Sequence, residues 1–118
     1  MRRNILLFGV LVCLAKNKAI SQSWEALGSG IGPYNGHVNA TVLYNGRLYA
    51  AGTFTTAGGA SANNIAKWNG INWSPLGVGI TGGVYSLAVY DGDLYAGGWI
   101  GSAGGIGVSN VARWNGSS

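Results

Sequence analysis

The chain has 118 residues, of which 22 are glycine and 47% are apolar, with five tryptophans, six tyrosines and a formal net charge of +4. This composition is too hydrophobic for a disordered segment, and the glycines lack the three-residue period and the proline of collagen. Four of the seven basic residues lie in the first 21 positions, so the remainder carries three basic against three acidic residues. Nucleic acid is therefore excluded as an expected partner, because it requires clustered cations.

Residues 1–21 have the pattern of a secretory signal peptide. A pair of arginines at the start precedes an apolar run over residues 5–15. That run is too short for a transmembrane helix, which needs about 20 residues, and it fits the core of a signal peptide. The small residues Ala19 and Ser21 predict cleavage after Ser21, which leaves a secreted or cell-surface chain without a stable membrane span.

The single cysteine, Cys13, lies inside this apolar run. A lipid anchor at Cys13 is the alternative, but Val12 stands where that modification prefers a small residue. Removal of the leader would leave a chain without cysteine. Such a chain has no disulfide, no thiol nucleophile and no thiolate metal ligand.

The rest of the chain, residues 22–118, contains an internal repeat. Residues 38–70 align without a gap on residues 84–116, and 15 of these 33 positions are identical. Upstream, Trp24 and the residues to Ile31 match the segment from Trp73 to Ile80, at a shift of 49 rather than 46. The first copy therefore carries three extra residues near 33–35, and insertions of this kind map to loops. The two repeats span about 24–72 and 73–118.

Turn signals divide each repeat into strands. Asn45-Gly46 and Asp91-Gly92 separate apolar runs and are typical of two-residue hairpins, whose central residues both need positive φ. Asn69-Gly70 and Asn115-Gly116 give the same signal at the other end of the repeat. The first repeat is predicted to contain four antiparallel strands, near 38–44, 47–54, 64–68 and 71–76, with a Gly, Ala and Ser loop between the second and third.

Four strands in 46 to 49 residues is the pattern of a β-propeller blade. Both alternating faces of residues 84–90 are mostly apolar, so the pattern predicts that neighbouring units cover both faces. The predicted fold class is all-β, with two four-stranded antiparallel blades of an incomplete propeller. A β-sandwich, which buries one face of each sheet, is the alternative.

The repeated pattern resembles known repeats. It runs Leu-Tyr-Ala-x-Gly, x-x-Ala-Gly-Gly, Asn-[Ile/Val]-Ala-[Lys/Arg]-Trp-Asn-Gly and Trp-x-x-Leu-Gly-x-Gly. It is similar to the kelch-like repeats of secreted β-propellers, a group that includes galactose-oxidase-type central domains and some fungal cell-surface proteins. The resemblance covers nearly all of residues 24–118 and implies a blade-building role for the following residues: Gly58, Gly59, Gly104, Gly105, Trp68 and Trp114.

Two blades do not close a propeller, because closed rings contain about four to eight. We therefore expect the sequence to be the front of a longer chain. The alternative is a short protein whose copies assemble into a ring.

Two motifs and two single residues suggest ligand chemistry but do not support it. Residues 77–82 fit a Gly-x-Gly-x-x-Gly dinucleotide pattern, but a strand rather than a helix is expected to follow, which favours a glycine-rich loop between blades. Asp91-Gly92-Asp93 offers two carboxylates where Ca²⁺ needs six or more oxygens, so a hairpin turn is favoured. His37 is the single histidine and is expected to be structural or exposed. Glu25 has no recognisable acid partner for glycoside hydrolysis.

The resemblance to galactose-oxidase-type proteins is expected to stop at the fold. Those enzymes use a Tyr–Cys cross-link and two histidines at copper, whereas residues 22–118 contain His37 and no cysteine. We accordingly predict no catalytic, cofactor-binding or metal-binding residues and no cofactor.

Surface aromatics and variable loops are the remaining candidates for binding. Tyr34, Tyr85 and Trp99 are candidates for stacking on sugars, although repeat aromatics more often belong to the core. The loops that differ between the copies, 53–63 and 99–109, are where contacts are expected. Glycosylation acceptor patterns begin at Asn39, Asn72 and Asn115 and matter only in a eukaryotic secretory pathway.

These observations predict an exported, non-catalytic β-propeller segment that binds protein or glycan or serves as a scaffold. The alternative is the N-terminal fragment of a secreted propeller enzyme whose catalytic residues lie beyond Ser118.

Overall fold

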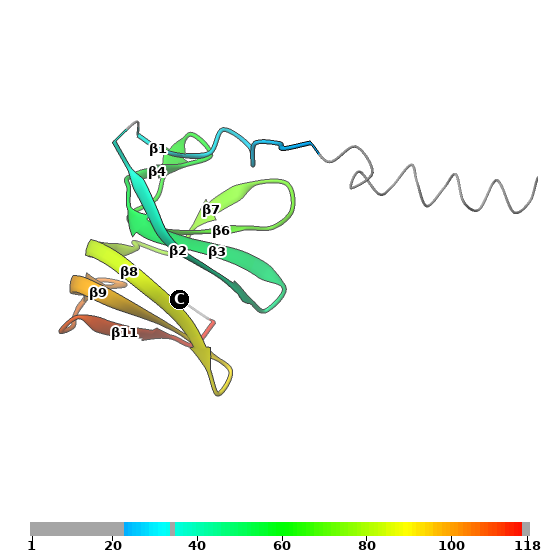
Figure 1. The fold of residues 1–118 in the computed structure, drawn as a ribbon. Coiled ribbons are helices and arrows are strands. Elements are labelled where there is room, and N and C mark those ends of the chain that lie inside the picture. The colour runs from blue at the N-terminus through cyan, green and yellow to red at the C-terminus, as the bar shows by residue number, and fades with distance from the viewer. Residues whose placement is uncertain (1–22, 34, 117–118) are drawn as a thin grey trace, which may run out of the picture.

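The computed structural model describes residues 23–33 and 35–116 of the chain. The predicted signal peptide at 1–21, with Cys13, lies outside the described residues, as does Tyr34. Within the described residues the fold is all-β, with antiparallel strands and no helix (Figure 1). The fold class is therefore confirmed at this level.

A four-stranded antiparallel sheet with the order β2-β3-β6-β7 combines strands of the first repeat with β7 from the start of the second. Its strands are β2 (His37–Tyr44), β3 (Arg47–Thr53), β6 (Ile65–Trp68) and β7 (Trp73–Pro75). They confirm the four predicted strands to within two residues at each end. A small three-stranded sheet stands beside it and contains β1 (Ile31–Gly32), β4 (Thr56–Ala57) and β5 (Ala60–Ser61).

The second repeat has the same pairing with longer strands. It contains β8 (Ile80–Tyr90), β9 (Asp93–Ala103), β10 (Ile106–Gly107) and β11 (Val111–Trp114). β8 spans the counterparts of β1 and β2, and β9 spans those of β3 and β4. Ile31 lies opposite Ala57, and the counterpart Ile80 lies opposite Ala103. The sequence repeat is therefore also a repeat of strand register, and the insertion at 33–35 separates β1 from β2.

Hairpin turns follow the predicted geometry at the main strand pair. Asn45 and Gly46 have φ values of 50° and 74°, and Asp91 and Gly92 have values of 51° and 81°. Both central residues of each turn are thus left-handed, as the twist of a two-residue hairpin requires.

The turn predicted at Asn69-Gly70 is wrong in its length. Four residues, 69–72, connect β6 to β7, and the Asn69 side-chain oxygen accepts the N–H groups of Ile71 and Asn72, each at 2.8 Å. An asparagine side chain that bonds the following backbone replaces the two-residue turn with a wider one.

The Gly, Ala and Ser segment of each repeat is a hairpin, where the sequence indicated a loop. Gly58 and Gly59 connect β4 to β5 with φ values of 62° and 81°, and Gly104 and Gly105 connect β9 to β10 with 60° and 83°. Paired glycines reach this conformation without steric cost.

A β-bulge recurs at the same place in both repeats. The register of β2 on β3 shifts at Asn39, and that of β8 on β9 shifts at its counterpart Tyr85. The strand opposite carries a glycine in each case. A Cβ on Gly52 would overlap the carbonyl oxygen of His37, and a Cβ on Gly98 would overlap that of Gly83. The bulge therefore requires glycine on the facing strand.

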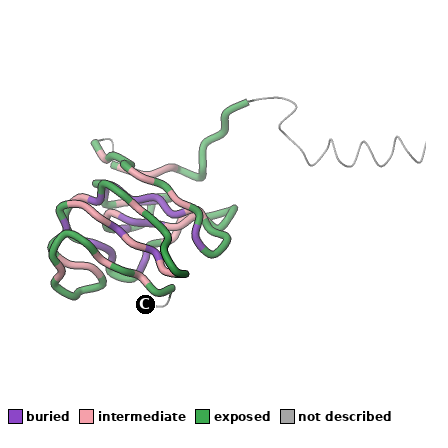
Figure 2. Tube along the Cα trace, turned by 60° about the horizontal axis from the view of Figure 1, so that its bottom comes forward, coloured by how far each residue is buried: buried purple, intermediate pink, exposed green. Residues whose placement is uncertain are grey.

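The two repeats share one apolar core. β8 packs against β2 and β3, and buried segments of both repeats meet at this contact (Figures 1 and 2). The Tyr44 hydroxyl crosses the seam and donates to the carbonyl of Gly92 at 2.9 Å. The core combines these residues: Tyr44, Tyr49, Ala51 and Ile65 from the first repeat with Leu76, Ile80, Val84, Leu94, Ala96 and Ile100 from the segment that follows.

The prediction that neighbours cover both faces of residues 84–90 is wrong for the described residues. Val84 is buried against the first repeat, whereas Tyr85, Val89 and Tyr90 are exposed. The two large sheets do not close into a ring. The second repeat has a neighbour on one side within residues 23–116.

Candidate binding groove between the repeats

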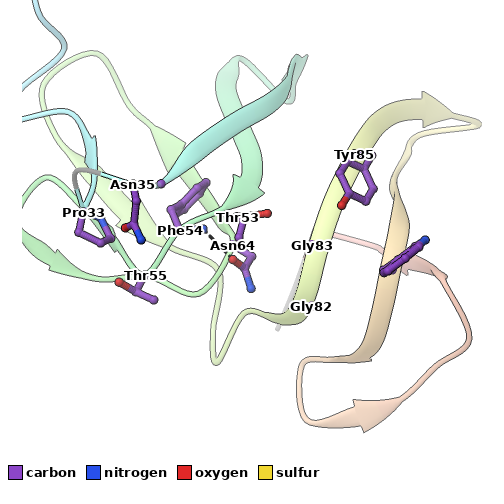
Figure 3. Close-up of a pocket in the computed structure, with 11 residues that line it drawn as sticks. Pro33, Asn35, Thr53, Phe54, Thr55, Asn64, Gly82, Gly83 and Tyr85 are labelled. Carbon is purple, nitrogen blue, oxygen red and sulfur yellow. Dashed lines mark hydrogen bonds between the residues drawn. The ribbon is translucent and has the colours of Figure 1, made fainter.

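A groove of about 610 Å³ lies where the end of β3 faces the beginning of β8 (Figure 3). It receives residues from both repeats and from the insertion at 33–35. The lining residues are Pro33, Asn35, Gly36, Thr53, Phe54, Thr55, Asn64, Gly82, Gly83, Tyr85 and Trp99.

Asn64 fixes the side of the groove that the first repeat forms, which we call the first-repeat wall. It adopts a left-handed φ of 65°, and its Oδ1 accepts the backbone N–H of Phe54 at 2.8 Å. Its Nδ2 donates to the carbonyl of Ile80 at 2.7 Å, which ties this wall to the second repeat. Phe54 is buried beneath the wall. Because the Asn64 amide is bonded at both ends, it positions the groove.

Two exposed aromatic side chains form the second-repeat wall. Tyr85 stands on the bulge of β8, and Trp99 stands on the neighbouring strand β9. Their counterparts in the first repeat are Asn39 and Thr53. The aromatic pair is therefore a property of the second repeat, and it faces polar side chains of the first.

Glycines allow the backbone of β8 to approach β9 closely at the base of this wall. Gly82 has a φ of 95°, and a Cβ there would overlap the carbonyl oxygen of Trp99. This residue ends the Gly-x-Gly-x-x-Gly stretch, and β8 already begins at Ile80. A strand rather than a helix follows the glycines, as the loop interpretation predicts, and the geometry of a phosphate site is not formed.

The described lining of the groove is uncharged. Asn35, Thr53 and Thr55 supply amide and hydroxyl groups among the apolar surfaces. Acidic residues lie at the far end of the same strands, where Asp91 has the positive φ of a hairpin turn. Asp93 there forms an exposed contact with Arg113 at 3.6 Å. A neutral ligand suits the groove, since a charged one would find no counter-charge.

The remaining ionisable candidates are not among the residues that line the groove, although His37 follows Gly36 of the lining and pairs with Thr53. His37 is exposed at the start of β2, and Glu25 is exposed in the segment before β1. No group of three potential metal ligands is found among residues 23–33 and 35–116.

The pKa of Tyr49 is raised in the shared core. Burial is the main cause, and the neighbouring Tyr44 adds to the increase, whereas Arg47 opposes it. The neutral phenol of Tyr49 is therefore the form that the fold favours.

Of the acceptor asparagines, Asn39 is engaged in the contact between repeats. Its Nδ2 donates to the carbonyl of Val84 at 2.8 Å. A glycan on this nitrogen would leave it a single N–H and would place the sugar at the contact between the repeats. Asn72 is exposed, and the pattern that begins at Asn115 extends to Ser117, beyond the described residues.

The structure brings together two of the three aromatic candidates, Tyr85 and Trp99. Tyr34 is outside the described residues, although its chain neighbours line the groove. Of the variable loops, only the beginnings contribute, at 53–55 and at Trp99. The contribution of Asn64 was missed, although its identity with Asn110 in the second repeat marked it as structurally important.

No helix in the described part of the chain combines the length and hydropathy needed to cross a membrane. Comparison with protein-family models, curated proteins and solved structures finds no match to this chain.

Proposed function

We propose that the chain is part of an exported, non-catalytic binding module, that its repeats are adjacent blades of a kelch-like β-propeller, and that the groove binds neutral glycan. The choice of a neutral glycan as ligand rests on one observation: the groove is uncharged and has two exposed aromatic side chains, Tyr85 and Trp99. Export rests on the leader pattern of residues 1–21.

Two features support the propeller interpretation. The strand registers recur after 46 residues, and the second sheet packs on the first through β8. A propeller is built by repeating one four-stranded sheet, each copy packing on the next in the same way. A β-sandwich pairs the inner faces of its two sheets, whereas here the face of the first repeat that carries Tyr44 packs against the face of the second repeat that carries Val84.

The groove has the chemistry that a sugar ring needs. A pyranose with equatorial hydroxyls presents C–H groups on its faces and hydroxyls around its edge. Tyr85 and Trp99 offer aromatic surface for the faces, and Asn35, Thr53 and Thr55 offer hydrogen bonds for the edge. We expect a β-linked glucose oligomer to be a suitable probe, because all of its hydroxyls are equatorial.

Binding is tested by titrating the purified chain with cellohexaose and following heat and tryptophan fluorescence. Trp99→Ala is expected to weaken binding at least tenfold, because an aromatic anchor in a site contributes about 2 kcal/mol or more. Tyr90→Ala is the matched control, since Tyr90 is an exposed aromatic at the other end of β8. It is expected to leave binding unchanged.

Two results would contradict this function. Equal loss of binding in both variants, with both still folded by circular dichroism, would remove the groove as the site. Cleavage of cellohexaose by the wild-type chain, abolished in a groove variant, would replace the binding module with an enzyme.

A further inference from the structure

The second repeat exposes the surface that the first repeat buries. Tyr44 is 3% exposed and Ile65 is 2% exposed, whereas their counterparts Tyr90 and Val111 are 71% and 60% exposed. The difference arises because β8 covers the first pair. We call the exposed surface around Tyr90 and Val111 the tail face.

The first repeat exposes the complementary surface. Val84 is fully buried at the seam, whereas its counterpart Val38 is 46% exposed. Leu76 is buried, and its counterpart Leu27 is exposed. We call the surface around Val38 and Leu27 the head face. The contact inside the chain is therefore a template for joining a head face to a tail face.

A tryptophan socket gives a second, independent observation. In the first repeat the Trp73 ring lies 5.3 Å from the Trp68 ring, between centroids, and its Nε1 donates to the carbonyl of Leu27 at 2.9 Å. Gly58 approaches the same indole so closely that a Cβ there would come within 3.2 Å of the Trp73 Cβ. The indole thus fills a site formed by one tryptophan and a glycine-rich hairpin.

The same socket in the second repeat lies open. Trp114, Gly104 and Leu76 are the counterparts of Trp68, Gly58 and Leu27, and they line a cavity of about 410 Å³. A Cβ on Gly104 would meet no atom within 4 Å. The strand edge beside the socket is open as well, since β11 pairs with β9 alone in the described residues, whereas β6 pairs with both β3 and β7.

The chain carries a segment that matches this socket. The segment Trp24-x-x-Leu-Gly-x-Gly-Ile31 has the pattern of Trp73-x-x-Leu-Gly-x-Gly-Ile80. Trp24 is fully exposed, and residues 24–26 are in no strand. Leu27 to Ile31 lead from Trp24 into the head face, as the residues after Trp73 lead into β8.

We propose that a second copy of this chain docks head to tail, with Trp24 of the partner subunit in the Trp114 socket and its head face on the tail face. The Tyr90 hydroxyl then donates to the carbonyl of Gly46 of the partner subunit, as Tyr44 does to Gly92. The Asn110 amide donates to the carbonyl of Ile31 of the partner subunit, as Asn64 does to Ile80. Tyr85 stands where the first repeat has Asn39, so the hydrogen bond from Asn39 to the carbonyl of Val84 has no counterpart between the two subunits.

Glycan binding and docking use neighbouring surfaces, which meet at Tyr85, since its counterpart Asn39 contacts Val84 across the seam. Asn39 and Thr53 remain exposed in the first repeat although the second repeat is docked on it. Their counterparts Tyr85 and Trp99 accordingly stay at the rim when a partner covers the tail face. Failure of one proposal leaves the other intact.

The association is measured by sedimentation velocity on the purified chain over a range of concentrations. The wild type is expected to form species larger than the monomer as concentration rises. Trp24→Ala and Tyr90→Ala, each at an exposed side chain, are expected to weaken association at least tenfold. Trp99→Ala is the matched control and is expected to associate like the wild type.

Mixing the variants tests the polarity. Trp24→Ala keeps an intact tail, and Tyr90→Ala keeps an intact head, so an equimolar mixture is expected to form a one-to-one complex with the wild-type affinity. A head-to-tail contact joins two different surfaces, whereas a head-to-head or tail-to-tail contact would gain nothing from mixing. A wild-type chain that stays monomeric at its highest soluble concentration would overturn the proposal. A mixture that remains monomeric would do so as well.

Discussion

Tyr44 and Tyr90 occupy the same position in two repeats with the same strand register, yet one is buried and the other faces water. The backbone around them is alike, so local sequence does not explain the difference. Within the part of the chain that the structure describes, the first tyrosine alone has a following repeat packed on it, and that repeat supplies the acceptor for its hydroxyl. Where repeats pack on their neighbours, the contact between repeats determines whether a residue is buried, and its position within the repeat does not.

The largest test of this comparison removes each tyrosine in turn. Tyr44→Ala is expected to lower the free energy of unfolding by about 3–5 kcal/mol, because it opens a cavity in the shared core. Tyr90→Ala is expected to change it by no more than about 0.5 kcal/mol, as is usual for an exposed side chain. Urea unfolding measures both, in a Trp24→Ala background so that association does not contribute. An equal loss of unfolding free energy in both variants would show that each tyrosine stabilises its own repeat rather than the contact between repeats.

A smaller effect separates the paired asparagines. Asn64→Asp keeps the oxygen that accepts the Phe54 N–H but loses the donor to Ile80, and it places a carboxylate oxygen against that carbonyl. We expect a loss of about 1–3 kcal/mol in unfolding free energy.

Asn110→Asp is the matched control for this change. Asn110 accepts the Ile100 N–H at 3.2 Å with the same oxygen, and that bond survives the substitution. In the Trp24→Ala background we expect a change of at most about 0.5 kcal/mol. A large loss here would mean that the amide nitrogen is required inside the repeat rather than between repeats.

The smallest effect concerns alkaline pH. The pKa of Tyr49 is higher in the folded chain than its usual value of 10.0, mainly through burial, so the folded state holds this proton more tightly than the unfolded state. Its contribution to stability is present below pH 10 and declines as pH rises through the folded pKa. Tyr49→Phe should flatten this part of the stability curve.

The control for the alkaline effect is Tyr95→Phe, at the counterpart position in the second repeat. Tyr95 is only half-buried. This variant keeps Tyr49, so we expect the alkaline decline to remain in place, measured by urea unfolding at several pH values. An unchanged curve for Tyr49→Phe would assign the decline to another group.

Much of the fold could be predicted from the repeat. Asn45-Gly46 and Asp91-Gly92 identified the main hairpins, because few residues adopt positive φ at two consecutive positions. The turn at 69–72 could not be predicted in the same way. There the side-chain oxygen of Asn69 bonds two backbone N–H groups, and sequence does not distinguish that use of asparagine from a left-handed turn.

The groove was harder to predict than the fold. Tyr85 and Trp99 were candidates because aromatic side chains can stack on sugars. The opposite wall comes from residues 35 to 66 positions earlier than Trp99, such as Asn64 and Pro33, and only the packing of β8 on the first repeat brings the walls together. The role of Asn64 depends on two hydrogen bonds that no local pattern shows.

The insertion at residues 33–35 lies between β1 and β2, where the corresponding residues of the second repeat are continuous within β8. Added length at this point leaves every later strand register unchanged, as the matching pairs of the two repeats show. Pro33 and Asn35 nevertheless form part of the groove. Under the proposed glycan-binding function, sequence variation here would change ligand choice without altering the strand pairing, which would make the junction a place where new specificities evolve.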